Sequence, residues 1–280
     1  MTDAPAVILV RPQLGQNIGM AARAMANFAL SDLRLVAPRD GWPNPEAGPA
    51  AAGADAVLDG ATVHASVAEA ARDCHRIYAT TVRPRDSRLS VFTPAEAVRA
   101  IREDAARGLR SGLLFGPERA GLTADDMAAA HAIVTCPVNP AFGSLNLAQA
   151  VVILAYEWFQ AGRAGPVGAG SRAADAPTAV PATAGEVDGL RRQLEAALEA
   201  AGYFHPPARA PVMRRRLAGI LANARLTGQD VRTLRGVVAA LAGRARAARD
   251  ATGGDAADAV PSAGGREGAP DGSRRREPAG

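Results

Sequence analysis

Short apolar runs alternate with helix-like segments from residue 6 to residue 160, and this alternation restricts the possible fold more than any other feature of the chain. Buried strands are predicted at Ala6–Val10, Leu33–Val36, Arg76–Thr80, Ser111–Phe115 and Ala132–Cys136. The spacing of apolar and small residues predicts helices at Ile18–Leu30, Val67–Arg72, Pro94–Ala106, Ala124–Ala130 and Val151–Glu157. Strands that alternate with helices are typical of a parallel sheet covered by helices. We therefore predict an α/β fold for this part of the chain.

The remainder of the chain has a different composition. Residues 162–185 are rich in Gly, Ala and Pro and lack an apolar period, which predicts a flexible linker. Residues 186–246 carry only helical patterns, with apolar stripes that begin at Leu190, Leu217 and Val231. From Ala247 the sequence is dominated by Gly, Ala, Asp, Arg and Pro, which indicates a disordered tail over 247–280. The predicted organisation is an α/β domain at 1–161, a linker, a small all-helical domain and a tail.

The positions of the arginines are more informative than their number. All 32 basic residues are Arg, but a GC-rich genome would raise Arg together with Ala, Gly and Pro, so the total does not indicate a function. The net charge is −1 over residues 1–185, +7 over 186–249 and −2 over 250–280. Concentration of positive charge in the helical segment is typical of a module that binds a polyanion.

Several classes of protein are excluded by what the sequence lacks. No run approaches the roughly 18 apolar residues of a membrane span, and no basic region precedes the first apolar stretch, so we expect no secretory signal. The two cysteines form neither a CxxC motif nor a Cys/His cluster, which favours a reducing cytoplasm and argues against a zinc site. Fingerprints for dinucleotides, P-loops, serine-hydrolase elbows and HExxH zinc sites are missing too.

The first segment with chemical promise is NIGMAAR, from Asn17 to Arg23. Gly19 and the alanines keep one side of this helix start narrow, so another backbone could pack closely. Taken alone, Asn17 is better explained as an N-cap and Arg23 as a solvated surface charge.

The second segment is LLFGPERAGL, from Leu113 to Leu122. Gly116 would let the backbone approach a ligand or another strand, and Glu118 could accept hydrogen bonds from nearby amides. An ordinary strand-to-helix turn accounts for the same residues equally well.

The third segment is NPAFGSLNLAQA, from Asn139 to Ala150, between a buried strand and a helix. Such loops are where α/β proteins usually bind ligands. Ser144 and Asn146 can cap the helix, hold a ligand, or do both.

In this order and at this spacing, NIGMAARAM, LLFGPERAGL and VNPAFGSLNLAQA resemble the three motifs of SPOUT-class (TrmH-like) RNA 2′-O-ribose methyltransferases. The stretch TTVRPRD, from Thr80 to Asp86, resembles the T-x-x-R-x-R-D loop of the TrmJ-type branch, which methylates residue 32 in the tRNA anticodon loop. Met213–Leu217 and Leu226–Gly236 are similar to that branch's C-terminal extension. The resemblance covers roughly residues 6–242.

The resemblance implies 2′-O-methylation of tRNA at nucleotide 32, cytidine or uridine or both. It also implies a parallel α/β sheet with a C-terminal trefoil knot, a cytoplasmic homodimer, and S-adenosyl-L-methionine as the cofactor, with no metal. The cofactor would contact residues that follow strands or precede the last helix of the domain, namely Thr80, Thr81, Gly116, Glu118, Cys136, Val138, Ser144, Leu145 and Asn146.

The same resemblance implies that Arg23 is the catalytic arginine, with Asn17, Ser144 and Asn146 beside it. A guanidinium loses a proton too reluctantly to act as an ordinary general base, so we assign Arg23 to holding a phosphate and orienting the 2′-hydroxyl. Phe142 departs from the family, which often has Tyr or Ser in this part of the loop. Because Phe142 cannot donate a hydrogen bond, any hydroxyl role there passes to Ser144.

The basic helical segment would then hold tRNA, although solvated helix faces would explain its arginines too. The candidate RNA contacts are Arg83, Arg85, Arg191, Arg192, Arg214, Arg215, Arg216, Arg225, Arg232 and Arg235. One alternative is the same chemistry on another RNA site, either the tRNA wobble position or ribosomal RNA. The other is a non-catalytic knotted protein that binds RNA. The helical extension argues against the wobble branch, and the intact motif residues argue against a loss of catalysis.

Overall fold

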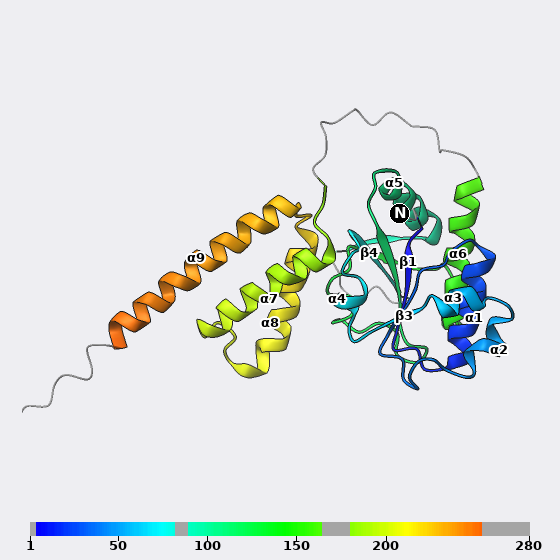
Figure 1. Cartoon of the computed structure of the whole chain (residues 1–280), viewed down its shortest axis with the longest axis horizontal. Helices are drawn as coiled ribbons and strands as arrows, with labels where there is room; N and C mark the ends of the chain where they lie inside the picture. The colour runs from blue at the N-terminus through cyan, green and yellow to red at the C-terminus, as the bar shows by residue number, and fades with distance from the viewer. Residues whose placement is uncertain (1–3, 82–88, 164–179, 254–280) are drawn as a thin grey trace, which may run out of the picture. The chain divides into compact units, whose positions relative to one another are not determined.

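A computed structural model describes residues 4–81, 89–163 and 180–253, and the account below is confined to them (Figure 1). The first part of the chain runs in the order β1 (Ala6–Val10), α1 (Gly15–Asn27), β2 (Leu33–Val36), α2 (Ala47–Ala51), α3 (Asp55–Asp59), β3 (Thr62–His64), α4 (Val67–Ala70), β4 (Arg76–Thr80), β5 (Ser90–Phe92), α5 (Pro94–Ala106), β6 (Ser111–Phe115), β7 (Ala132–Val134) and α6 (Leu147–Arg163). The second part comprises α7 (Ala184–Ala200), a 3₁₀ turn (Pro207–Arg209), α8 (Ala210–Asn223) and α9 (Gly228–Gly253).

The strands form one seven-stranded sheet in the order β3-β2-β1-β6-β4-β7-β5, and every neighbouring pair is parallel. Ile8 at the centre of β1 is paired with Arg34 of β2 on one side and with Leu114 of β6 on the other. Two strands that come late in the sequence lie between earlier ones, because β6 separates β1 from β4 and β7 separates β4 from β5. The predicted α/β fold with a parallel sheet is confirmed.

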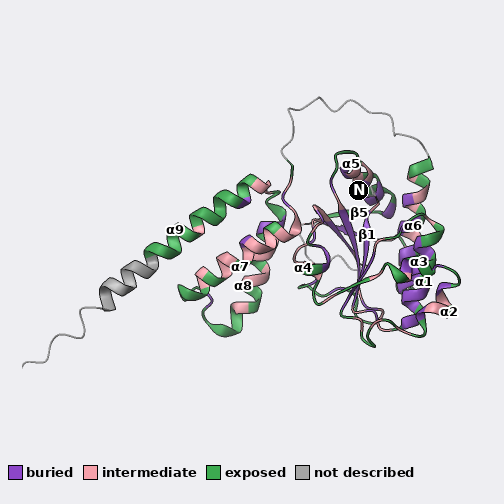
Figure 2. Ribbon diagram, viewed as in Figure 1, coloured by how far each residue is buried: buried purple, intermediate pink, exposed green. Residues whose placement is uncertain are grey.

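Helices cover both faces of the sheet, which explains why its central strands are mainly apolar. On one face Leu9, Leu35 and Leu113 pack with α1, α3, α5 and α6 in the larger apolar cluster. On the other face Ile8, Ile77 and Leu114 form a smaller cluster with α4 and the loop before β7. Figure 2 shows the buried strands between α4 and the layer of α1, α3 and α6. A strand that is buried on both faces has no polar side chains to alternate with apolar ones.

Some predicted bounds were wrong, for physical reasons that the structure makes clear. Residues 124–130 form successive turns and not the predicted helix. Thr123 and Asp126 make the side-chain contacts of a capping box, as Thr183 and Glu186 do before α7, but no continuous helix follows them. The edge strands β3 and β5 were missed because both are largely exposed and neither has an apolar run.

The helical segment begins where Thr183 and Glu186 form a capping box at the start of α7. Leu190, Leu221 and Val231 form its small apolar core, one residue from each of α7, α8 and α9. By packing, the chain divides into two compact units, Met1–Ala239 and Ala240–Gly280. Helix α9 continues past Arg246, the predicted limit of the helical domain, to Gly253. Most of the predicted linker and tail lies outside the described residues, so the domain limits at 161, 185 and 246 stay predictions.

Among the described residues, no helix has both the length and the apolar character that a membrane span requires. Among the same residues no group of three or more His, Cys, Asp or Glu side chains is arranged to hold a metal ion.

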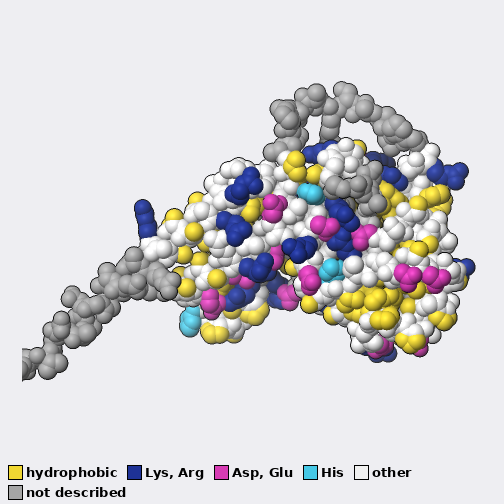
Figure 3. All heavy atoms as spheres, in the orientation of Figure 1, with side chains coloured by type: hydrophobic (Ala, Val, Ile, Leu, Met, Phe, Trp, Pro, Cys, Tyr) yellow, Lys and Arg dark blue, Asp and Glu magenta, His cyan; other side chains and the backbone are white. Residues whose placement is uncertain are grey.

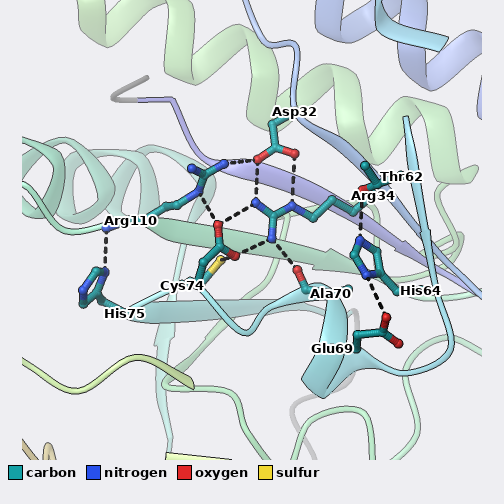
Figure 4. Close-up of polar contacts among 10 residues, drawn as sticks. Asp32, Arg34, Thr62, His64, Glu69, Ala70, Cys74, His75 and Arg110 are labelled. Carbon is teal, nitrogen blue, oxygen red and sulfur yellow. Dashed lines mark hydrogen bonds and ion pairs between the residues drawn. The ribbon is translucent and has the colours of Figure 1, made fainter. Parts of the chain in front are cut away.

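The amino ends of the central strands are joined by a network of ion pairs (Figure 4). Arg34 of β2 is 8% exposed and contacts Asp32 at 2.8 Å and Asp73 at 2.5 Å. Arg110, just before β6, contacts the same two carboxylates. The hydrogen bond and charge of Arg34 hold the pKa of Asp73 below its usual range against the effect of burial. The network thus ties together the segments that lead into β2, β4 and β6.

Candidate functional site

The three sequence motifs meet at the carboxyl edge of the sheet. Strands β1, β6, β4 and β7 are neighbours and parallel, so the segments that follow them all emerge at one edge. These segments are the start of α1, the Gly116–Leu122 turn, Thr81, and the loop from Thr135 to Asn146. Ligands of open α/β sheets usually bind at this edge.

A chain of hydrogen bonds joins one residue from each motif. Asn17 of α1 donates from Nδ2 to Oε1 of Glu118 at 2.6 Å. Its Oδ1 accepts from Nδ2 of Asn146 at 3.0 Å, and the second Glu118 oxygen accepts from the backbone amide of Gln13 at 2.9 Å. Asn17 is 2% exposed, so both ends of its amide are satisfied inside the protein. The prediction that Glu118 accepts hydrogen bonds from nearby amides is confirmed.

The interpretation of Asn17 as a helix cap was wrong. Helix α1 begins at Gly15, its N-cap is Leu14, and no side chain caps it. Asn17 therefore lies within the first turn, where its side chain is available for the contact with Glu118 and Asn146. The cap was predicted from residue type alone, and residue type does not say on which residue a helix begins.

Glycines at two positions allow the backbone segments around the site to pack closely. A Cβ on Gly19 would lie 2.1 Å from the carbonyl oxygen of Ala47, so the predicted close packing against α1 is confirmed, with α2 as its partner. A Cβ on Gly116 would lie 2.3 Å from the amide nitrogen of Leu122, so the turn after β6 closes tightly on itself. The tight turn fixes where Glu118 lies relative to the start of α1.

Asn146 also caps α6, which begins at Leu147. Its Oδ1 accepts from the amide of Ala148 at 2.8 Å, while its Nδ2 holds Asn17. The predicted capping role of Asn146 is confirmed. Ser144 is exposed on the same loop, and its hydroxyl is placed where a ligand could reach it. A helix N-terminus and exposed polar groups together favour ligands with acceptor atoms.

The remaining candidate cofactor residues line the ends of β4 and β7. Thr80 Oγ1 donates to the carbonyl of Leu114 at 2.8 Å, and Thr135 Oγ1 donates to the carbonyl of Thr81 at 2.9 Å. These bonds bind neighbouring strand ends together, so the Thr80 hydroxyl has only acceptor capacity left for a ligand. Cys136, Val138 and Leu145 are half-buried in the loop after β7. Burial raises the pKa of the Cys136 thiol, which keeps it uncharged.

Arg23 is exposed on α1, six residues after Asn17. That separation is about 9 Å along the helix axis. Arg23 is thus carried by the same rigid helix that anchors Asn17, which suits a cation that must be held at a set distance from the site.

A second tie joins the segments beside the first two motifs, and no sequence pattern predicted it. Arg11, directly after β1, has a left-handed φ of 47° and donates from Nη1 to Asp126 at 2.9 Å. Asp126 lies in the turns that follow Glu118 and is 6% exposed. Only the position of Arg11 at the end of a predicted strand could have marked it as a residue of this edge.

Several candidate RNA-binding arginines are engaged within the protein. Arg214 pairs with Glu199, Arg215 with Asp125 at 3.3 Å, and Arg191 with Asp188 at 2.6 Å. Figure 3 shows Arg and acidic side chains intermixed on the visible face of this segment. The net charge of +7 already counts Asp188 and Glu199, so among these pairs only that of Arg215 with Asp125, which lies outside residues 186–249, offsets it further. Arg192 is exposed but pairs with Asp188 at 3.0 Å, whereas Arg216, Arg225, Arg232 and Arg235 are exposed and have no ion pair among the described residues. Arg83 and Arg85 lie outside the described residues.

Comparison with known proteins gives concordant results. The model of the SpoU rRNA Methylase family matches residues 4–156. The tRNA (cytidine/uridine-2′-O-)-methyltransferase TrmJ of Pectobacterium atrosepticum is 34% identical over 252 residues, 86% of this chain and 98% of the relative. The tRNA (cytidine/uridine/adenosine-2′-O-)-methyltransferase TrmJ of Pseudomonas aeruginosa is 39% identical over 157 residues, which span 56% of this chain and 61% of the relative.

Among solved structures, TrmJ from Z. mobilis ZM4 is 51% identical with a TM-score of 0.76, and the match covers 85% of this chain and 99% of that one. A probable methylase family protein from Haemophilus influenzae Rd KW20 matches with a TM-score of 0.55 at 25% identity, over 87% of this chain and 97% of that one. The family match includes β1, α1, β6, β7 and most of α6, the elements that build the hydrogen-bonded site. The chain belongs to the SpoU rRNA Methylase family.

Proposed function

We propose that this protein methylates the 2′-hydroxyl of a tRNA ribose with S-adenosyl-L-methionine, and that the target is cytidine or uridine at nucleotide 32 of the anticodon loop. The observation that carries the proposal is the bonding of Asn17 to both Glu118 and Asn146, because it assembles the three motifs of a methyltransferase into one site. The relatives named as tRNA 2′-O-methyltransferases support the choice of substrate.

The residues at the carboxyl edge fit a bound methyl donor. The tight Gly116 turn, Glu118 and the loop residues Cys136, Val138 and Leu145 offer backbone groups and one carboxylate rather than a cluster of cations. S-adenosyl-L-methionine supplies an electrophilic methyl group on a sulfonium centre. A transfer that removes this positive charge in the transition state gains from a site that does not over-stabilise the cation.

Arg23 would hold the phosphate beside the target ribose. Asn17 would hold the start of α1 in a fixed position relative to the cofactor loops. The ribose oxygen must be in line with the methyl group, so positioning accounts for most of the rate. Ser144, exposed on the third loop, would supply the hydroxyl that Phe142 cannot.

A trefoil knot at the C-terminal side of the sheet is part of the proposal. Its support is the interleaved strand order, in which the chain returns late to place β6 between β1 and β4 and β7 between β4 and β5. Such threading is rare among proteins, and the SPOUT class is one of the exceptions.

We also propose a cytoplasmic homodimer. The outer faces of α1 and α6 carry the exposed apolar residues Met20, Val152 and Tyr156, which are 41%, 40% and 46% exposed, and Arg23 lies one turn beyond Met20. A second copy would bury this surface beside the site. Sedimentation velocity across a range of concentrations tests the dimer, and Val152→Glu with Tyr156→Glu should produce monomers.

For RNA contact, the structure favours the exposed arginines over the paired ones. Arg214→Glu with Arg215→Glu should weaken tRNA binding and flatten its salt dependence, but it also breaks contacts with Glu199 and Asp125. Arg216→Glu with Arg232→Glu avoids those ion pairs. Unchanged affinity and salt slope in both double variants would contradict a tRNA role for this segment.

Nucleoside mass spectrometry tests the function as a whole. Purified protein, S-adenosyl-L-methionine and unmodified tRNA should yield 2′-O-methylcytidine or 2′-O-methyluridine that maps to nucleotide 32, and tRNA with a 2′-deoxy nucleotide at that position should yield none. Methylation at the wobble nucleotide or in ribosomal RNA instead would favour the alternative substrates. Failure to bind S-adenosylhomocysteine in calorimetry would favour a non-catalytic RNA-binding protein.

A further inference from the structure

Phe142 is the most exposed large hydrophobic side chain in the described part of the chain, at 78%. Of the other exposed large apolar residues, Tyr156 lies on α6, Tyr203 lies in the turn after α7, and the rest are not aromatic, whereas Phe142 is an aromatic ring on a loop of the candidate site. An aromatic ring exposed to water on such a loop is available to stack against the flat face of a ligand.

The loop holds this ring in a defined place. The amide of Phe142 donates to the carbonyl of Asn139 at 2.9 Å, which closes a four-residue turn with Pro140 at its second position. Asn139 Oδ1 accepts from the amide of Ala141 at 3.0 Å and braces the same turn. Proline and an Asx bond both restrict the turn before any ligand binds. The exposed ring is therefore presented by an ordered backbone.

The turn is directly connected to the candidate site. Asn146, which bonds to Asn17, follows Phe142 by four residues, so the two lie within about 14 Å of each other along the chain. No charged residue occurs between Cys136 and Ala150, whereas Arg23 provides a cation on α1. The loop thus offers an uncharged, aromatic surface, which suits a base and not a phosphate.

We propose that Phe142 stacks on the base of the nucleotide whose ribose is methylated. This inference rests on the proposed function, which supplies a single-stranded RNA loop whose bases can be unstacked. Stacking on a phenyl ring uses the π face that every base possesses and reads no hydrogen-bonding edge. Phe142 therefore positions the target nucleotide without selecting its base, so that cytidine and uridine are both accepted at this contact.

The test compares Phe142→Ala, Phe142→Leu and Phe142→Tyr in the full-length protein, with Val212→Ala as an exposed apolar control on α8. The substrates are anticodon stem-loop RNAs with cytidine, uridine or an abasic ribose at nucleotide 32. The abasic RNA retains the reacting hydroxyl but has no base to stack. Readouts are kcat and KM for RNA, calorimetry with S-adenosylhomocysteine, and the thermal midpoint.

We expect Phe142→Ala and Phe142→Leu to raise KM for RNA about tenfold or more, as loss of one stacked base requires. Phe142→Tyr should stay within about threefold of the original. Binding of S-adenosylhomocysteine and the thermal midpoint should not change. The abasic RNA should be as poor a substrate for the original protein as the cytidine RNA is for Phe142→Ala, and combining the two changes should add no further loss.

Three results would overturn the proposal. Additive losses from the abasic RNA and Phe142→Ala would show that the ring and this base do not contact each other. Full activity of Phe142→Leu would show that any apolar side chain serves at this position and that the aromatic ring is not needed. Dissociation of a dimer by Phe142→Ala in sedimentation would show that the ring packs against a second copy of the chain. An original protein that methylates no RNA would instead refute the proposed function.

Discussion

The two edges of the parallel sheet differ in their main polar contacts. At the amino edge, arginines and carboxylates form the ion-pair network of Arg34, Arg110, Asp32 and Asp73. At the carboxyl edge, the amide side chains of Asn17 and Asn146 bond to each other and to Glu118, and a single ion pair joins Arg11 to Asp126. The amino edge satisfies its charges internally, whereas the carboxyl edge leaves Arg23 and Ser144 facing outward.

The amino edge therefore serves mainly the stability of the sheet, and the carboxyl edge serves mainly its function. Charges that are paired and partly buried hold strands in register but have no capacity left for a ligand. Amides that are satisfied behind an exposed surface keep that surface rigid and leave it available. Changes at the carboxyl edge should therefore affect catalysis first, and changes at the amino edge should affect folding first.

The largest effect is expected from Asn17→Ala. Loss of the Asn17 amide leaves Glu118 and Asn146 without their shared hydrogen-bond partner, so the three motifs are no longer held together. We expect kcat/KM for tRNA methylation to fall about 10³-fold, equivalent to about 4 kcal/mol. The exposed neighbour Gln16, changed to Ala, is the matched control on the same helix. Equal activity of the two variants would show that the amide link does not organise the site.

The second-largest effect is expected from Arg34→Met at the amino edge, and it is an effect on stability. This change removes the central cation but leaves Arg110 in contact with Asp32 and Asp73. Breaking a buried ion pair on one side should lower the free energy of unfolding by about 3 kcal/mol, measured by urea titration. Arg39→Met removes a partner from an exposed pair with Asp40 and should leave the free energy of unfolding nearly unchanged. If the Arg34 variant is as stable as the original protein but has a greatly reduced kcat, the amino edge contributes to catalysis and the proposed distinction between the two edges is wrong.

Acid should weaken the amino edge through His131, which precedes β7. Its Nδ1 accepts from the amide of Ile77 at 3.1 Å, and burial, together with the charges of Arg76 and Arg225, lowers the pKa of His131 to about 4. The unfolded chain takes up this proton at higher pH than the folded one does. Stability is therefore complete above about pH 6.5 and should fall by on the order of 2 kcal/mol toward pH 4.

The measurement is the pH dependence of urea unfolding in the original protein and in His131→Asn. The Asn oxygen can still accept from Ile77 but does not titrate, so this variant should lose less stability between pH 6.5 and pH 4. Parallel curves for the two proteins would assign the acid sensitivity to other groups, such as His75, whose pKa is also lowered by burial.

The smallest effect is expected from Arg11→Gly. Glycine accepts the left-handed backbone at this position but removes the guanidinium that holds Asp126. The turns after Glu118 should become looser, and kcat/KM should fall about tenfold with little change in thermal midpoint. Arg11→Lys should restore part of the activity. If Gly, Lys and the original residue are equally active, the pair with Asp126 does not position the site.

The accuracy of the sequence predictions follows the burial of each element. The bounds of β1, β2, β4, β6 and α5 agree with the prediction, because continuous apolar runs or a clear capping signal mark them. Strands β3 and β5 escaped notice since each has only three residues and an exposed face. The Ala-rich stretch before β7 has helix-forming composition, yet Thr123, Asp126 and Arg11 hold it in turns.

The candidate site could be predicted only in parts. Glu118 and Asn146 were recognisable because they follow strands and precede a helix, and the capping role of Asn146 depends on neighbouring residues alone. The partner of each residue could not be predicted, because Asn17 lies far from both along the chain. Arg214 and Arg215 appeared available for RNA, but their acidic partners are 15 and 90 residues away in the sequence.

The sequence by itself determined the class of fold, the order of the main elements and the family motifs, since apolar period, capping residues and motif spacing are local properties of the chain. The tertiary structure decided which motifs meet and how their side chains are satisfied. The order in which strands pair is the physical reason, because insertion of β6 and β7 between earlier strands brings Asn17, Glu118 and Asn146 to one edge. Phe142 illustrates both contributions: its identity is in the sequence, and its exposure beside that edge is a property of the fold.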